Sequence, residues 1–459
     1  MTLITSIYDK EKALRLRPQG FEYVNFDDSN FTKAFLSCFS PETPATVILG
    51  PGGSGKSVIL RMLAAYYGKK SLLLAPTGIA AHNLENPWSA PRTIHAGLGL
   101  PVIPYMPMHS MFRKPMEALH DKDIVMLDEV SMVNAPVLDC IIRHIEEANR
   151  DRRRKIKLIC FGDEYQLQPP FDEDKLRPIL RNHPDLSENW TFMQSRTLMA
   201  LKPDIYVLET VYRQSNPRFK EVLGHVRKGI PEDADIDYLN ALVKPEPDRK
   251  SLVLAATNKE VDAVNNEHIA ELGRNQKPQF FDADFLFGKA ITDCGFSQHL
   301  ELYKGQRVMC TRNLYDEDNS PIYQNGTLGT VVDFRYENGE LLPVVRADDG
   351  RLFPVPYMQF EECTYQKTED GKYEYLPIAR ALMIPLRSAY CVTYHKAQGL
   401  TLDRVHLMVP DHKPLPGMMY LGCSRVRTPE GLSLSSKVTA EMFSLSKEKI
   451  TKDGNTLIR

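Results

Sequence analysis

The stretch that decides the fold runs from Thr46 to Ala65 and reads T-V-I-L-G-P-G-G-S-G-K-S-V-I-L-R-M-L-A-A. It opens with a short apolar run, continues through a glycine-rich loop of the pattern G-x-x-x-x-G-K-S/T, and ends in a segment of helical character. The glycines allow backbone N–H groups to converge on phosphate oxygens, and the first turn of the helix adds its positive end at the same place. This passage predicts a parallel α/β domain with a phosphate site at the end of a strand.

The residues of this loop are the candidates for binding a nucleoside triphosphate. Within them, the Lys56 ammonium would reach the β- and γ-phosphates, and the Ser57 hydroxyl would bind Mg²⁺. The alternative is a glycine-rich turn that binds no nucleotide, and the strand–loop–helix context argues against it. The predicted cofactor-binding residues here are Gly50, Pro51, Gly52, Gly53, Ser54, Gly55, Lys56 and Ser57.

Polar side chains end two other strand-like runs. Asp128 and Glu129 follow the run Ile124–Leu127, and Gln166 lies in the stretch after Lys157–Phe161. A carboxylate beside a phosphate loop can hold Mg²⁺, which suits Asp128, and a second can orient and deprotonate the attacking water, which suits Glu129. Gln166 would sense the γ-phosphate or place that water. Taken alone, the acidic pair is also typical of a helix N-cap region, and Gln166 of a turn.

The apolar runs fall into two series, and a segment with a different sequence pattern separates parts of the second series. The first series is 46–49, 71–75, 123–127 and 157–161, and the second begins with 204–208 and 251–255 and resumes at 388–393 and 405–409. Continuous apolar runs separated by helix-length segments are typical of parallel sheets covered by helices on both faces. Between about 296 and 385, Asn-Gly and Asp-Gly pairs alternate with β-rich runs, which predicts the hairpins of a small barrel. The predicted fold class is α/β, with two parallel-sheet domains in tandem and an all-β insert.

Composition restricts the kind of protein further. The chain has 459 residues, of which 42% are hydrophobic and 25% charged, and its net charge is −2. These values suit a soluble globular protein of several domains and exclude a generally basic binder, so any grip on nucleic acid must come from a local channel. The cysteines form no C-x-x-C pair, which argues against a zinc ribbon and a disulfide framework. The N-terminus has no long apolar core and does not read as a signal peptide.

Taken in order, the motifs of the chain resemble those of superfamily-one DNA helicases of the 5′-to-3′ branch, the RecD/Pif group. D-E-V-S-M at 128–132 and G-D-E-Y-Q-L-Q-P-P at 162–170 are very similar to motifs of that family. The other matches are Gly50–Ser57, Ala75–Ala81, Thr93–His95, Val211–Gln214, Thr257–Val261, Tyr394–Asp403 and Tyr420–Arg427. One departure is the family's adenine-reading Gln just before the loop, because the only upstream Gln is the distant Gln19. Either the segment Asn25–Phe39 replaces that contact, or another residue makes it.

The resemblance implies two RecA-like domains in tandem, a small SH3-like all-β insert and a short wedge loop. With the patterns above, it divides the chain into an N-terminal segment at 1–45 and a first RecA-like domain at 46–202, which contains the wedge insert at about 97–118. The second RecA-like domain would occupy 203–295 and 386–459. The β-rich insert would occupy 296–385.

The resemblance also implies ATP and Mg²⁺ as cofactors and assigns catalytic roles. The catalytic set is Lys56, Asp128, Glu129, Gln166, Arg213 and Arg425, and the metal ligands are Ser57 and Asp128. Arg213 and Arg425, both expected in the second domain, would act as arginine fingers, each worth about 10³–10⁵ in rate in related enzymes. Tyr212 would stack on the base or pack in the core. Gly399 would complete the nucleotide site.

By the same resemblance, short polar or cationic side chains on loops would bind DNA phosphates without reading the bases. These DNA-binding candidates are Thr77, Gly78, Thr93, His95, Thr257, Asn258, His395 and Lys396. The uncharged, proline-rich loop from Gly97 to Phe112 would be a wedge that meets the duplex junction, with Tyr105 and Phe112 as its contacts. The alternative for this loop is a surface loop that packs internally. The alternative for His95 and His395 is that they are ordinary packed or surface histidines.

The resulting prediction is an ATP-driven helicase that moves 5′ to 3′ on single-stranded DNA and unwinds duplex or structured DNA. The alternative is a nucleotide-gated DNA-binding or remodelling ATPase without processive unwinding. A small-molecule kinase is a third reading, but it has no use for Arg213, Arg425 or the late H-K-A-Q-G element. The expected partners are single-stranded, duplex, forked or G-quadruplex DNA, with no membrane and a monomeric chain. It would act in DNA repair, recombination, replication or telomere maintenance, in the cytoplasm with the nucleoid if bacterial or phage and in the nucleus if eukaryotic.

Overall fold

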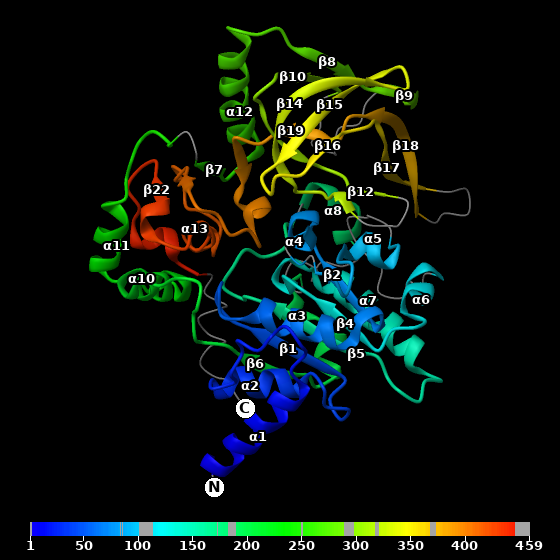
Figure 1. Cartoon of the computed structure of the whole chain (residues 1–459), viewed down its shortest axis with the longest axis vertical. Coiled ribbons are helices and arrows are strands. Elements are labelled where there is room, and N and C mark those ends of the chain that lie inside the picture. The colour runs from blue at the N-terminus through cyan, green and yellow to red at the C-terminus, as the bar shows by residue number, and fades with distance from the viewer. Residues whose placement is uncertain are drawn as a thin grey trace. The chain divides into compact units, whose positions relative to one another are not determined.

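The chain, as a computed structural model, divides into two compact units (Figure 1). Unit 1 contains the residues up to Ser251 and those from Tyr394 onward, and unit 2 runs from Leu252 to Thr393. The structure describes residues 2–82, 84, 86–100, 113–171, 173–181, 190–248, 251–288, 298–316, 321–367 and 373–445.

Unit 1 is built on a six-stranded sheet with the order β3-β2-β4-β5-β1-β6. The strands are β1 (Ala45–Leu49), β2 (Ser71–Ala75), β3 (Arg92–Thr93), β4 (Ile124–Leu127), β5 (Lys157–Gly162) and β6 (Asp204–Val207). Every neighbouring pair is parallel, and β1, β2, β4 and β5 are buried at every residue. The predicted α/β architecture is confirmed. Because the carboxyl ends of parallel strands share one edge, the loops after β1, β4 and β5 meet there.

The strand β6 corrects the prediction that the second domain begins at 203. Asp204 lies opposite Thr46 and Val207 opposite Leu49, so β6 pairs with β1 at the edge of the first sheet. A short apolar run has the same pattern in either sheet, and the sequence alone could not choose between them. The first sheet therefore extends beyond the predicted boundary at 202.

Helices cover both faces of this sheet because alternate strand residues point to opposite sides. Ile48 and Leu73 pack with α2 and α3 on one face, whereas Val47 and Leu74 belong to the core that contains α7 on the other. The helices of unit 1 are α1 (Thr2–Leu16), α2 (Ser29–Ser37), α3 (Lys56–Tyr67), α4 (Gly78–His82), α5 (Ile94–Leu98), α6 (Arg113–Leu119), α7 (Ala135–Asn149), α8 (Glu173–Leu180), α9 (Arg196–Ala200), α10 (Pro217–Lys228), α11 (Asp233–Asn240) and α13 (Met418–Cys423).

The later part of unit 1 carries the two arginines that the sequence singled out. The strands β21 (Val405–Leu407) and β22 (Leu432–Leu434) pair in parallel, and α10 packs against α11 and α13. The helix α10 begins where the Asn216 side chain accepts a backbone N–H and ends at Gly229, which has a left-handed φ of 72°. Arg213 lies just before α10, and Arg425 just after α13.

Unit 2 begins and ends with parallel strands. The strands β7 (Leu252–Ala255) and β20 (Cys391–Thr393) pair in parallel, and the Asn265 side chain of α12 (Asn258–Gly273) donates to the Cys391 carbonyl and accepts the Cys391 N–H. Between them lies the all-β module, with one sheet of order β16-β15-β14-β11-β19 and another of order β17-β18-β9. Its strands are β8 (Gln279–Asp282), β9 (Asp284–Phe287), β10 (His299–Leu302), β11 (Arg307–Cys310), β12 (Leu314–Tyr315), β13 (Pro321–Tyr323), β14 (Leu328–Glu337), β15 (Glu340–Ala347), β16 (Leu352–Pro354), β17 (Met358–Lys367), β18 (Tyr373–Met383) and β19 (Leu386–Ser388).

The predicted hairpins are present, although the module is longer than expected. Asn338 and Gly339, with φ of 50° and 86°, connect β14 to β15, and Gly350, with φ of 91°, connects β15 to β16. The predicted turn at 370–371 lies outside the described residues. The module begins before the predicted boundary at 296, because β8 pairs with β10 and β9 with β18. It also continues past 385, because β19 pairs with β11.

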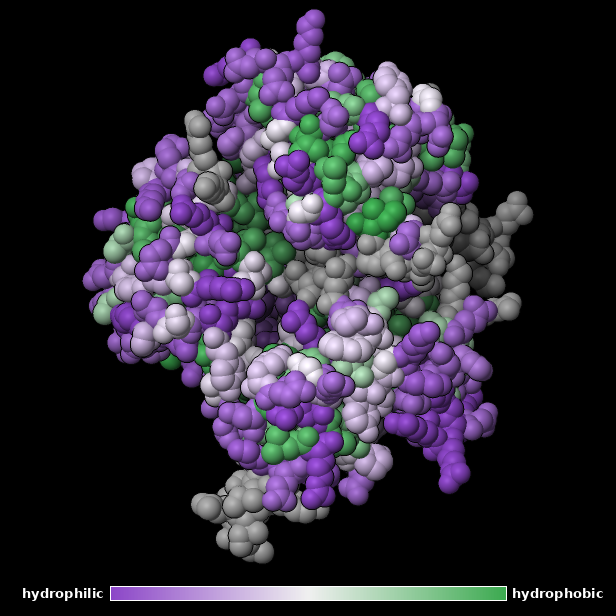
Figure 2. All heavy atoms as spheres, in the orientation of Figure 1, coloured by the Kyte–Doolittle hydropathy of each residue, from purple (hydrophilic) through white to green (hydrophobic). Residues whose placement is uncertain are grey.

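The described residues on the pictured face form no broad apolar band. Hydrophilic residues predominate there, and hydrophobic ones form separate patches (Figure 2). Among the helices that the structure describes, none combines the length and the apolar character that a membrane span requires.

Candidate functional site

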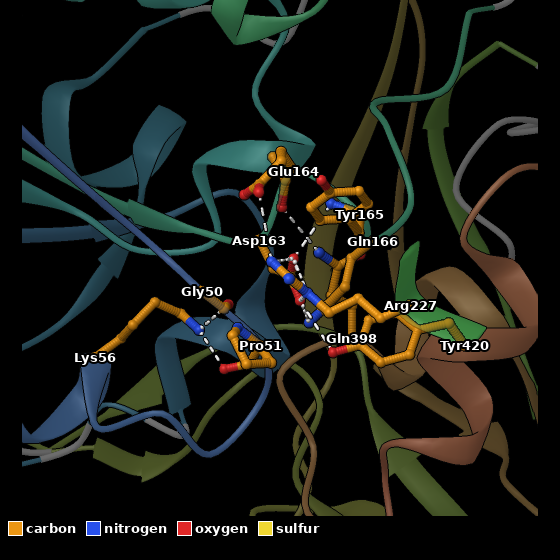
Figure 3. A network of polar contacts seen from close by, with 11 residues as sticks. Gly50, Pro51, Lys56, Asp163, Glu164, Tyr165, Gln166, Arg227, Gln398 and Tyr420 are labelled. Carbon is orange, nitrogen blue, oxygen red and sulfur yellow. Dashed lines mark hydrogen bonds and ion pairs between the residues drawn. The ribbon is translucent and has the colours of Figure 1, made fainter. Parts of the chain in front are cut away.

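The phosphate loop joins β1 to α3 and has the conformation that its glycines allow. Gly53 and Gly55 have φ values of 84° and 94°, in the left-handed region that favours glycine. Gly55 is the N-cap of α3, so the helix begins at Lys56. The Lys56 Nζ donates to the carbonyl oxygens of Gly50 and Pro51 at 2.6 and 2.9 Å (Figure 3). The Lys56 ammonium group therefore lies against its own phosphate loop.

Arg213 and Arg425 both lie at the phosphate loop. A methyl group on Gly52 would be 3.3 Å from Arg213 Nη1 and 3.7 Å from Arg425 Nη2. A methyl group on Gly53 would be only 2.2 Å from Arg213 Cβ. The backbone N–H of Tyr212 donates to the Gly53 carbonyl at 2.8 Å and fixes this approach. The arginine segment can lie so close to the loop because Gly53 has no side chain.

The two arginines are desolvated cations that repel each other. Arg425 is 1% exposed, and its donors are held by the carbonyl oxygens of Leu421 at 2.9 Å and Leu400 at 3.2 Å. Burial, and then the charge of Arg425, lowers the pKa of Arg213 to about 10, and burial also lowers the pKa of Arg425. The Glu129 carboxylate offsets part of both effects. A bound polyanion would stabilise both cations, so the electrostatics of this site favour a triphosphate.

Asp128 and Glu129 follow β4 at the same edge of the sheet. Burial, and then the charge of Glu129, raises the pKa of Asp128 to about 7. Glu129 has a φ of 48°, a left-handed conformation that costs a non-glycine residue about 1–3 kcal/mol. The Gln398 Nε2 donates to Glu129 Oε2 at 3.1 Å and to Ser131 Oγ at 3.3 Å. A strained backbone and a held carboxylate together indicate a side chain whose orientation matters for function.

The turn after β5 forms a buried polar network beside the loop (Figure 3). Asp163 Oδ1 accepts from Nε and Nη2 of Arg227 at 3.1 and 2.9 Å. Asp163 Oδ2 accepts from the Tyr420 hydroxyl at 3.1 Å and from Gln166 Nε2 at 3.2 Å. Burial opposes the ionisation of Asp163, but the charges of Arg227 and Lys56 outweigh it and hold the pKa of Asp163 below its ordinary value. This network joins the later part of unit 1 to the turn that contains Gln166.

Several buried polar atoms around the loop are available to a ligand. In the described parts of the chain, Ser54 Oγ, Gln166 Oε1 and Gln398 Oε1 have no hydrogen-bond partner. Buried polar groups are normally paired, so these atoms fit a site that takes phosphate and its attacking water. Ser57 and Asp128 offer the oxygen ligands that a Mg²⁺ ion prefers. With the glycine cradle, these residues fit a magnesium-bound nucleoside triphosphate.

Two aromatic rings lie beside the phosphate loop. The Tyr212 side chain is 59% exposed, which contradicts the core-packing alternative for it. A methyl group on Gly55 would be 3.0 Å from the Phe31 ring and 3.9 Å from the Tyr212 ring. Phe31 belongs to the segment that was expected to replace the missing Gln. Asp28 caps the helix of Phe31 and accepts the Thr210 hydroxyl at 2.7 Å.

Comparison with known proteins agrees with this geometry. The AAA domain family matches residues 38–172, which include the phosphate loop. The ATP-dependent DNA helicase Pif1 of Campylobacter jejuni is 24% identical over 411 residues, which cover 84% of this chain and 88% of the relative. The crystal structure of Bacteroides Pif1 bound to single-stranded DNA has a TM-score of 0.76 at 25% identity and covers 92% of this chain and 96% of that one. The chain is Pif1-like in sequence and in fold.

Human PIF1, also an ATP-dependent DNA helicase, is 28% identical to this chain over 396 residues. This match covers 83% of the chain but only 57% of the human protein. A further Bacteroides Pif1 structure, in complex with ADP-AlF3 and single-stranded DNA, has a TM-score of 0.76 at 25% identity and covers 92% of the chain and 95% of that one. The tandem RecA-like architecture with an all-β insert is therefore shared with solved Pif1 structures.

Three threonines that the sequence predicts to bind DNA begin helices. The hydroxyl oxygens of Thr77 and Thr93 accept backbone N–H groups at 3.2 and 3.3 Å, at the starts of α4 and α5. Thr77 follows β2, and Thr93 is the last residue of β3, which pairs in parallel with β2, so both lie at one edge of the first sheet. In unit 2, Thr257 forms a capping box with Glu260 at the start of α12. Their contact with DNA stays a prediction.

The remaining predicted DNA contacts are divided between the units. They are Gly78 in α4, His95 in α5, Asn258 in α12, and His395 and Lys396 in the 3₁₀ turn Tyr394–Ala397. Burial lowers the pKa of His95 and of His395, so both are neutral at about pH 7 and would contact DNA as neutral donors. The wedge residues Tyr105 and Phe112 lie outside the described residues.

Sequence reasoning missed four residues of this site: Asp163, Arg227, Gln398 and Tyr420. Asp163, Gln398 and Tyr420 lie inside the quoted motifs, and their polar side chains at those positions could have found them. Gly399, which was singled out, follows Gln398 with a left-handed φ of 82° and turns the chain there. Arg227 had no such signal, because it is one arginine at the end of a helix and its partner lies 64 positions away.

Proposed function

We propose that the chain is an ATP-dependent DNA helicase that moves 5′ to 3′ on single-stranded DNA and unwinds duplex or forked DNA. The observation that carries the proposal is the placement of Arg213 and Arg425 at the phosphate loop. Both arginines come from segments that follow the first sheet in sequence, as a motor needs when hydrolysis must move one part of the chain against another.

Binding and hydrolysis of ATP divide among residues of unit 1. The loop amides and Lys56 bind the β- and γ-phosphates, which would draw the Lys56 ammonium away from the loop carbonyls. Ser57 and Asp128 would hold Mg²⁺, which would neutralise charge on the phosphates. The rings of Tyr212 and Phe31 receive the base.

Hydrolysis requires a correctly oriented water molecule and stabilisation of the negative charge that develops on the γ-phosphate. Glu129, held by Gln398, orients the attacking water and accepts its proton. Gln166 senses the γ-phosphate. Arg213 and Arg425 stabilise the charge that develops on the γ-phosphate, the effect that makes an arginine finger worth about 10³–10⁵ in rate.

The DNA part of the proposal is supported by the relatives. One solved structure concerns DNA unwinding at forked double-stranded DNA by two coordinating Pif1 helicases, and it matches at 25% identity with a TM-score of 0.74. Thr77, Thr93 and His95 contact the DNA backbone from the first domain, and Tyr105 and Phe112 form the wedge. Unwinding of G-quadruplexes and action as a monomer complete the proposal. Such a protein works with the nucleoid in a bacterium and in the nucleus of a eukaryote.

Strand displacement on tailed duplexes tests this function. We expect the wild type to unwind 5′-tailed but not 3′-tailed duplexes, with ATP hydrolysis stimulated by single-stranded DNA. Lys56→Ala should abolish both activities with thermal unfolding unchanged, whereas Lys69→Ala, an exposed lysine beyond the other end of α3, should leave both intact. Stimulated hydrolysis without displacement would favour the remodelling ATPase, and displacement of 3′-tailed duplexes would refute the polarity. Absence of stimulated hydrolysis would refute the proposal.

A further inference from the structure

Arg227 contacts three consecutive residues, Asp163–Tyr165, of the turn that leads to Gln166 (Figure 3). Its guanidinium donates to Asp163 Oδ1 at 3.1 and 2.9 Å and to Glu164 Oε1 at 3.4 Å. The same group lies 4.2 Å from the centroid of the Tyr165 ring. Arg227 is 8% exposed and Asp163 is 0% exposed. A buried, two-pronged ion pair of this kind fixes the geometry of both partners.

The turn is held from a second direction by α13. A methyl group on Gly417, the N-cap of α13, would be 2.4 Å from the carbonyl oxygen of Tyr165, so the start of this helix lies directly against the turn. The Tyr420 hydroxyl, one turn further along, donates to Asp163. Gln166 is fixed inside the turn, because its side-chain N–H and its backbone N–H both donate to Asp163, at 3.2 and 3.1 Å. The Gln166 side chain therefore depends on where Asp163 is held.

The two helices that hold this turn are each adjacent in sequence to an arginine of the phosphate site. Arg213 precedes the first residue of α10, and Arg227 lies in its last turn, about 15 Å further along the axis at 1.5 Å per residue. Arg425 follows α13, whose Tyr420 reaches the same turn. A movement of α10 as a rigid rod would displace Arg213 and, through Arg227, the turn that contains Gln166. The arginines and the γ-phosphate sensor are mechanically linked.

We propose that Arg227 is a positioning residue for ATP hydrolysis, which aligns Gln166 with the terminal phosphate and couples that alignment to Arg213. The inference rests on the proposed function, because it requires hydrolysis at the phosphate loop. Arg227 acts through Asp163. Lysine in its place would keep the charge but lose the two-pronged bond and the contact with the Tyr165 ring. Loss of this alignment lowers kcat while the binding of ATP is retained.

The test measures DNA-stimulated ATP hydrolysis by the full chain carrying Arg227→Gln or Arg227→Lys. We expect kcat to fall by about 10²-fold and about 10-fold respectively, with KM for ATP changed by less than about threefold. Arg218→Gln is the matched control, since Arg218 lies on the same helix and pairs with Asp235 and Glu221 instead. This control removes ion pairs from α10 and should leave kcat at the wild-type level.

A double variant separates positioning from a merely structural role. Because Arg227 acts through Gln166, Arg227→Gln combined with Gln166→Ala should lose no more in kcat than the worse of the two single variants. The inference is overturned if folded Arg227→Gln keeps kcat within about threefold of wild type, or if the two losses multiply. If Arg227→Gln does not fold, as thermal unfolding would show, Arg227→Lys is judged by the same criteria. A wild type without DNA-stimulated hydrolysis would instead refute the proposed function.

Discussion

Replacing Gly53 with alanine should push the arginine segment away from the phosphate loop. The added methyl carbon would lie 2.2 Å from Arg213 Cβ, 3.1 Å from Arg213 N and 3.2 Å from Arg213 Cα. Carbon atoms in ordinary contact are about 3.5–4.0 Å apart, so this segment must retreat by more than about 1 Å. A misplacement of about 1 Å can cost roughly 10²-fold in rate. The left-handed φ of 84° adds strain of about 1–2 kcal/mol for alanine.

We therefore expect Gly53→Ala to lower kcat of DNA-stimulated ATP hydrolysis by about 10²-fold. Steady-state hydrolysis at saturating single-stranded DNA measures this, and thermal unfolding reports the strain. Gly68→Ala is the matched control, because Gly68 also has a positive φ, of 51°, but no atom lies within 4 Å of its methyl position. This variant carries the backbone strain at the other end of α3 without the collision, so it should lose stability and keep kcat.

Two results would refute this reasoning. One is a folded Gly53→Ala chain that hydrolyses ATP within about threefold of the wild type, since Arg213 would then not need its present position. The other is a Gly68→Ala chain that loses as much activity, since strain alone would then explain the loss. A graded comparison adds a third check: the methyl group of Gly52→Ala meets only the ends of two long side chains, Arg213 at 3.3 Å and Arg425 at 3.7 Å, so this variant should lose less activity than Gly53→Ala.

The remaining predictions concern Glu129, its hydrogen-bond partner Gln398, and the buried His406. Glu129→Gln should lower kcat by at least about 10²-fold while nucleotide binding, measured by equilibrium titration, stays near that of the wild type. Gln398→Ala removes the amide that holds Glu129 and should lower kcat by about 10-fold without changing KM for ATP, and an unchanged kcat would contradict this role. Burial lowers the pKa of His406 below its ordinary value of 6.5, so the unfolded chain binds a proton that the folded chain does not. Its contribution to stability is present above about pH 6.5 and is lost on acidification, so Tm should fall between about pH 7 and pH 5, and His406→Asn should reduce that slope.

The fold was predictable where local pattern determines it. The passage from Thr46 to Ala65 carries its own strand, loop and helix, because apolar runs, glycines and helix formers act over a few residues. The hairpin turn at Asn338 and Gly339 was predictable for the same reason, since two successive left-handed residues require such a pair. The strand β6 was misplaced because the choice between two sheets depends on pairing with β1, which no local pattern reveals.

The residues of the candidate site were likewise predictable only where a local pattern marks them. The loop and the carboxylates after β4 were predictable because they lie at strand ends, where parallel sheets collect ligands. The ion pair between Arg227 and Asp163 was not, because it joins residues 64 positions apart. The bond from Tyr420 to Asp163 spans 257 positions. Such pairs appear only when packing brings the helices α10 and α13 to the turn.

The left-handed conformation of Glu129 matters to anyone who wishes to make this chain more heat-resistant. A search for substitutions that relieve backbone strain would choose glycine at this position, for a gain of about 1–2 kcal/mol. The variant would withstand heating better and, by the role proposed for this carboxylate, would no longer turn over ATP. At Glu129, thermal stability and the rate of ATP hydrolysis therefore make opposite demands on the residue. Substitutions meant to increase stability without losing activity must be sought elsewhere in the chain.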